Sequence, residues 1–197
     1  MILTKLLKKS PIVLLALNLI ACSVLTPPAM PTPRAADIDK EEQAVYSYFV
    51  AENNKALILQ DTSTNIANDD PQQTVDFIKS GLKGISTETL DNYLERNKQP
   101  SQLSPTMNLG VEYVLLSRED IMKISSQPDW GQLMNAKFPG THGYIIFSRV
   151  GFNNTLDQAV IYVGNVGGPL MGAGYYYLME KQNGRWIMKQ QIMAWIS

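Results

Sequence analysis

Cys22 is the only cysteine of this 197-residue chain, and it follows Leu19-Ile20-Ala21 at the end of an apolar run. The pattern is typical of a bacterial lipobox, where cleavage before the cysteine is accompanied by acylation of its sulfur and its new amino group. The chemistry predicted at Cys22 is therefore lipidation. It would tether the rest of the chain to a membrane.

The residues before Cys22 have the order of an export signal. Lys5, Lys8 and Lys9 precede an apolar stretch of only eleven residues, from Pro11 to Ala21. A membrane-spanning helix needs about 20 residues, whereas the apolar part of a signal peptide has roughly 7–15. We therefore predict a lipoprotein signal peptide over residues 1–21. An ordinary secretory peptide with a chance cysteine is the alternative.

Ser23, which follows the lipidated cysteine, bears on localisation. In Gram-negative envelopes, an aspartate at this position commonly retains a lipoprotein at the inner membrane. Its absence predicts a lipid-anchored protein of the cell envelope, at the outer membrane if the host is Gram-negative. The sequence leaves open whether the domain faces inward or outward.

His142 is the only histidine, so any Ser/His/Asp hydrolase chemistry would depend on it. Ser148 is close in sequence, but the chain has no Gly-x-Ser-x-Gly motif for a nucleophile elbow. A solvated turn residue between Thr141 and Gly143 explains His142 more simply. We predict no catalytic residue, and keep a cell-envelope hydrolase using His142 as the alternative.

The sequence predicts neither a metal site nor a cofactor. One histidine and one cysteine cannot supply the three or four ligands of a zinc site. A cluster of oxygen ligands could bind calcium, but its spacing is not that of an EF-hand, and capping and solvated loops explain it better; it comprises Asp61, Asn65, Asn68, Asp69 and Asp70.

The glycine-rich segment from Gly164 to Gly174 invites a phosphate-loop interpretation, but it lacks the Gly-Lys-Ser/Thr ending and precedes a strand. We expect a strand connection whose glycines adopt tight φ angles. Arg149, in an apolar strand, either faces outward or forms a structural ion pair. Tyr175, Tyr176 and Tyr177 alternate between the faces of a strand, where core packing is expected and one face could line a groove.

The helices and strands that must position these residues are predicted from helix-capping residues and from the spacing of apolar residues. Asp39 and Glu42 have capping-box spacing for a helix near Asp37, and Asp70-Pro71 and Ser86 begin two further helices. Ser117 with Asp120 caps a short helix, and helical spacing continues from Trp130 until Pro139. Strands are predicted over residues 56–60, 111–116, 144–150, 158–163, 175–181 and 185–196.

These elements predict an α+β fold, in which N-terminal helices pack on a C-terminal antiparallel sheet. The sheet is a meander of about four strands that ends in a hairpin at Asn183-Gly184, a pair that favours the positive φ angles of a type I′ turn. Residues 22–36 contain four prolines and predict an extended tether, or else an irregular arm packed on the domain. Residues 37–197 are predicted to form one globular domain.

The net charge of the chain without its signal peptide narrows the classes of partner that it could bind. Removal of residues 1–21 takes away three lysines and no acidic residue, which leaves 14 basic and 18 acidic residues and a net charge of −4. Nucleic acid is not expected as a partner, because phosphate binding needs clustered Lys and Arg. No second cysteine is present to form a disulfide, so stability must come from a core.

The carboxy-terminal part resembles an uncharacterised family of bacterial secreted proteins over residues 42–197, most strongly over the last 60. The resemblance implies export and brings no activity or catalytic residue with it. The segments that carry it are Leu59–Thr62, Trp130–Gly140, Phe147–Asn153, Gln158–Gly164, Gly167–Gly174, Gly184–Trp186 and Trp195–Ser197.

The sequence therefore predicts a membrane-anchored envelope lipoprotein of unknown activity. It is expected to act as a binding or interaction module for a protein or small-molecule ligand, on an architecture similar to cystatin-like or nuclear-transport-factor-like cones.

Overall fold

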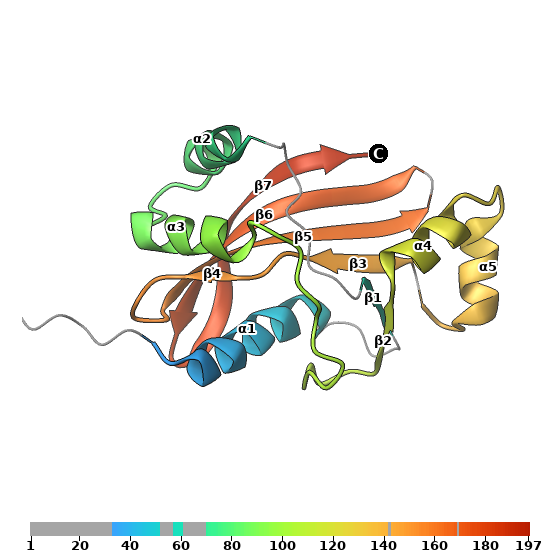
Figure 1. Ribbon diagram of the computed structural model, residues 1–197, viewed down its shortest axis with the longest axis horizontal. Helices are drawn as coiled ribbons and strands as arrows, with labels where there is room; N and C mark the ends of the chain where they lie inside the picture. Colours follow the sequence, from blue (N-terminus) through green and yellow to red (C-terminus); the bar gives the residue numbers. More distant parts are fainter. Residues whose placement is uncertain (1–32, 52–56, 61–69, 142, 169) are drawn as a thin grey trace, which may run out of the picture. The chain divides into compact units, whose positions relative to one another are not determined.

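The computed structural model describes residues 33–51, 57–60, 70–141, 143–168 and 170–197 (Figure 1). The described part is α+β, as predicted, and its helices pack on a sheet that occupies most of the C-terminal half. The first element of the described residues is α1 (Ala35–Val50), and β1 (Leu57–Gln60) precedes α2 (Pro71–Gly81) and α3 (Thr87–Arg96). After β2 (Tyr113–Leu116) come α4 (Arg118–Ser125) and α5 (Trp130–Lys137).

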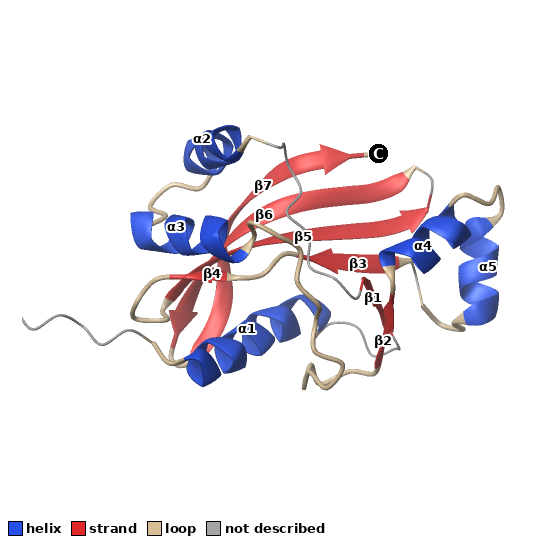
Figure 2. Ribbon diagram, in the orientation of Figure 1, coloured by secondary structure: helices blue, strands red, loops and turns tan. Residues whose placement is uncertain are grey.

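The remaining strands follow one another along the chain. They are β3 (Tyr144–Phe147), β4 (Gly151–Phe152), β5 (Gln158–Gly168), β6 (Met171–Gln182) and β7 (Arg185–Ile196). The strand order is β2-β1-β3-β5-β6-β7, and β4 pairs with β5. Figure 2 shows the long strands β5, β6 and β7 side by side, with β7 at the edge.

The antiparallel meander and its terminal hairpin are confirmed. Strands β5, β6 and β7 pair antiparallel, and β6 joins β7 through Asn183 and Gly184, whose φ angles are 50° and 79°. The sequence did not indicate that β1 would pair parallel with both β2 and β3. The sheet is therefore mixed, because segments distant in the chain insert at one edge of the meander.

Three of the predicted helix starts are confirmed by hydrogen bonds. The side chain of Asp70 accepts from the backbone N–H of Gln72, that of Ser86 from Thr89, and that of Ser117 from Asp120. Each cap satisfies an amide that has no partner within its helix.

The predicted capping box at the first helix is wrong. Helix α1 begins at Ala35, two residues before Asp37, and its N-cap, Arg34, makes no side-chain capping bond. Asp39 and Glu42 lie inside the helix. Glu42 is buried, because its carboxylate binds arginines far away in the sequence rather than the nearby backbone.

Both faces of the sheet are covered. The side chains of β5 alternate, so that Ile161 faces the core formed with α1, whereas Tyr162 faces the core formed with α2 and α3. Tyr176 is in the second core and Tyr177 packs against the first, so core packing is confirmed for these two tyrosines. Tyr175 is half-buried and belongs to neither core. A third cluster, around Trp130 and Met134, holds α4 and α5.

Buried tyrosines make the fold sensitive to alkali. Burial raises the pKa values of Tyr162 and Tyr176 to about 12 from the ordinary value of 10.0, and it also raises those of Tyr46 and Tyr93. The folded state therefore holds these protons more tightly than the unfolded state does. Their contribution to stability is complete below about pH 10 and is lost as the pH rises from about 10 towards 12.

We expect the urea midpoint of unfolding to fall steeply between pH 10 and pH 11. Because lysines also titrate there, the informative quantity is the slope of the midpoint against pH. Tyr176→Phe should have a shallower slope than the wild type, since one ionisable group is gone. Equal slopes would contradict the role assigned to Tyr176.

Candidate functional site

The residues that carry the two chemical predictions, Cys22 and His142, lie outside the described residues. So do Asp61, Asn65, Asn68 and Asp69 of the possible calcium cluster, whereas Asp70 caps α2. Across the part of the chain that the structure describes, no group of three or more His, Cys, Asp or Glu side chains could hold a metal ion.

None of the helices described is both long enough and apolar enough to cross a membrane.

Arg149 belongs to a buried ion-pair cluster, which is the second of the two predicted alternatives. Its Nη2 lies 2.6 Å from Glu42 Oε2 and its Nε donates to Glu42 Oε1 at 2.9 Å. Arg96 Nη2 and the backbone N–H of Val150 donate to the same Oε1, each at 2.9 Å. Burial lowers the pKa of Arg149, but attraction to Glu42 outweighs this effect, and the pKa lies above its ordinary value.

This cluster is structural. The Glu42 carboxylate joins α1 to α3 and to the segment that links β3 and β4, and Glu42 is only 6% exposed. A general base must present a free lone pair to its substrate. The oxygens of Glu42 already accept bonds from two guanidinium groups and one backbone amide.

A cleft lies on the sheet face at the end of β5 and β7, where residues from several elements meet. We call it the aromatic cleft. Its volume is about 640 Å³, and it is lined by Ser125, Ser126, Gln127, Pro128, Trp130, Tyr144, Ile146, Val166, Gly168, Trp195 and Ser197. Three of these side chains are aromatic, and none of the described lining residues has an acidic or basic side chain.

The glycines of the glycine-rich segment lie within strands, against Trp195 and Tyr162, which corrects the prediction for that segment. Gly164 lies in β5 and Gly172 and Gly174 lie in β6, and none of the three has a positive φ. Their role is steric. A Cβ on Gly174 would collide with the Trp195 ring and the Tyr162 hydroxyl, and one on Gly172 would lie 2.9 Å from the Trp195 ring.

Trp195 is fixed in orientation by these glycines and by one hydrogen bond. Its Nε1 donates to the Tyr162 hydroxyl at 2.6 Å, and its ring packs over the glycines of β6. Across the cleft, the ring of Tyr144 lies 6.5 Å from that of Trp130, which is only 4% exposed. Burial raises the pKa of Tyr144, and Arg118 partly opposes that effect. Tyr144 and Trp195 are thus the half-buried rings that a ligand would contact.

The remaining walls carry neutral polar groups. Ser126 Oγ donates to the Lys123 carbonyl at 3.0 Å, which leaves the oxygen lone pairs of the hydroxyl as acceptors. Gln127 is exposed beside it. Three apolar side chains stand at the same end of the sheet, with exposures of 83% for Leu170 and 70% for both Met171 and Ile196.

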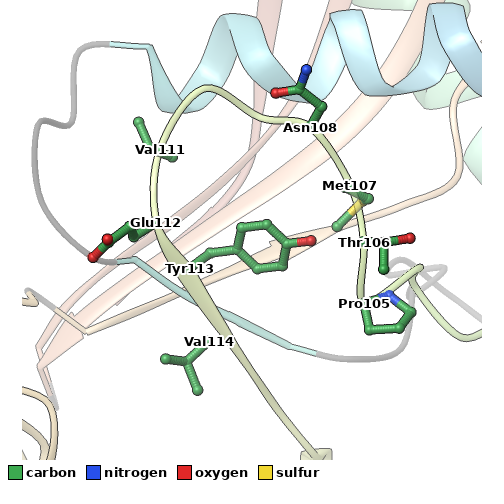
Figure 3. Close-up of a pocket in the computed structure, with 8 residues that line it drawn as sticks. All are labelled: Pro105, Thr106, Met107, Asn108, Val111, Glu112, Tyr113 and Val114. Carbon is green, nitrogen blue, oxygen red and sulfur yellow. The ribbon is translucent and has the colours of Figure 1, made fainter.

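Two other hollows are weaker candidates. One, of about 560 Å³, is formed by residues 105–108 and 111–114, and Figure 3 shows the Tyr113 ring between these two stretches. The Tyr113 hydroxyl is buried and has no hydrogen-bond partner among the described residues. The other, of about 830 Å³, lies between α1 and the hairpin at Gly184. The first is formed by one stretch of chain, and the second runs along α1.

Sequence reasoning missed the aromatic cleft. It places Tyr144 and Trp195 in strands, but strand assignments alone do not bring β3 and β7 to one site. The signal that was present is the glycine run in β5 and β6, because glycines without a turn role indicate a close approach by another group.

No protein-family model, curated protein or solved structure matches this chain. The resemblance to bacterial secreted proteins therefore stays a prediction.

Proposed function

We propose that this protein is a lipid-anchored binding module of the bacterial cell envelope, which holds its ligand in the aromatic cleft. The observation that carries the binding function is the cleft itself, in which half-buried rings from two strands stand beside neutral polar groups. Such a mixture is typical of ligand sites, where apolar walls provide affinity and a few polar groups provide orientation.

The preformed shape of the cleft supports this function. The indole of Trp195 is held by one hydrogen bond and by the absence of Cβ atoms beneath it, so little side-chain freedom is lost when a ligand binds. The exposed apolar residues at its end of the sheet also favour an interaction surface, because contiguous apolar patches on soluble domains mark binding sites.

The anchoring part of the proposal is supported by the sequence around Cys22, with its short apolar run and preceding lysines. The alternative, a cell-envelope hydrolase using His142, gains no supporting observation, because His142 lies outside the described residues.

Labelling with radioactive palmitate tests the anchor. The wild type should incorporate label and sediment with membranes. Cys22→Ala should lose essentially all of the label, because its thioether cannot form. Ser23→Ala is the matched control and should keep the label, since the acceptor sulfur is intact. Equal labelling of the wild type and Cys22→Ala would end the lipoprotein proposal.

A further inference from the structure

We infer that the aromatic cleft binds an uncharged saccharide. This inference rests on the proposed binding function and names its ligand class.

The chemistry of the lining selects for a neutral ligand that is both apolar and rich in hydroxyls. A phosphate or carboxylate ligand would require Arg or Lys, and a cationic ligand would require a carboxylate. None of the described lining side chains carries one of these groups, but they do offer serine hydroxyls and the Gln127 amide. A sugar ring has an apolar C–H face that packs on an aromatic ring and an edge of hydroxyls that needs neutral partners.

Aromatic rings from two strands meet at the cleft. Tyr144 is on β3 and Trp195 is on β7, with β5 and β6 between them. The Trp195 ring extends across the glycines of β6 to the Tyr162 hydroxyl of β5, so the ring lies nearer to β3 than its own backbone does. Two rings that line one cleft give a sugar two apolar surfaces on which to pack.

Titration calorimetry on the lipidated protein in phospholipid nanodiscs tests the inference. The probes are the tetramer of β-1,4-linked N-acetylglucosamine, maltotetraose, the anionic tetramer of galacturonate and a neutral apolar peptide. At least one neutral tetramer should bind, and galacturonate should bind more weakly than either neutral tetramer. Tyr144→Ala should weaken the binding about tenfold, because it removes one of the two half-buried rings.

Two further variants separate an effect on binding from an effect on folding. Gln127→Ala changes an exposed lining residue and should weaken saccharide binding severalfold without a change in thermal midpoint. Tyr48→Ala removes a partly exposed aromatic ring on α1, away from the cleft, and should bind as the wild type does.

The outcomes distinguish the inference from the proposed function. If no neutral tetramer binds but a neutral apolar peptide does, and Tyr144→Ala abolishes that binding, the saccharide inference is overturned and the binding module survives. Preferential binding of galacturonate overturns the inference as well. If neither saccharides nor apolar peptides bind, both the inference and the function assigned to the cleft fail.

Discussion

Replacement of Glu42 by alanine is expected to lower the free energy of unfolding by about 3–5 kcal/mol, the range observed when one partner of a buried ion pair is removed. Arg149 and Arg96 would keep their charges with side-chain exposures of only 22% and 16% and without the carboxylate that pairs them. The backbone N–H of Val150 would also lose its acceptor. Urea denaturation at pH 7, followed by circular dichroism, measures the change.

Asp39 provides the matched control one turn earlier in α1. Its side chain is 65% exposed and lies 3.9 Å from Arg149, so Asp39→Ala should cost no more than about 1 kcal/mol. A second test replaces all three charged residues with methionine. This variant should recover much of the lost stability, because it leaves no unpaired charge in the interior. A cost for Glu42→Ala as small as that for Asp39→Ala would contradict the buried-cluster interpretation.

Substitution of Gly151 by alanine is expected to destabilise the protein by about 3 kcal/mol, at the upper end of the usual cost of overpacking. Gly151 is in β4, where a Cβ would lie 2.5 Å from both the N and the Cα of Tyr93 in α3. These are backbone atoms of a helix and cannot rotate aside. The added methyl group must therefore push α3 away from β4, which opens the core around Tyr93.

Substitution of Gly131 by alanine is expected to change the stability in the opposite direction. Gly131 lies in α5, and a Cβ there would meet nothing within 4 Å. Gly131→Ala should stabilise the protein by about 0.5 kcal/mol, because alanine loses less backbone entropy on folding. Thermal and urea midpoints of the two variants should therefore move in opposite directions. A neutral Gly151→Ala variant would show that α3 does not press on β4.

The positions that sequence reasoning identified correctly are those governed by neighbours in the chain. Asp70, Ser86 and Ser117 cap helices through amides two or three residues away. Asn183 and Gly184 form a hairpin through their own φ preferences. Glu42 has the same local spacing as a capping residue but binds Arg149, 107 residues further along the chain. Spacing along the chain cannot show whether the Glu42 carboxylate binds the nearby backbone or a distant arginine.

The sequence by itself determined the α+β class and the terminal hairpin, because each depends on composition or on residues close together in the chain. The export signal and lipidation at Cys22 are predictions from the same kind of local pattern. The tertiary structure decided the parallel insertion of β1, the burial of Glu42 and the meeting of Tyr144 with Trp195 at one cleft. These features depend on contacts between segments far apart in the chain, which residue types and short spacings do not encode.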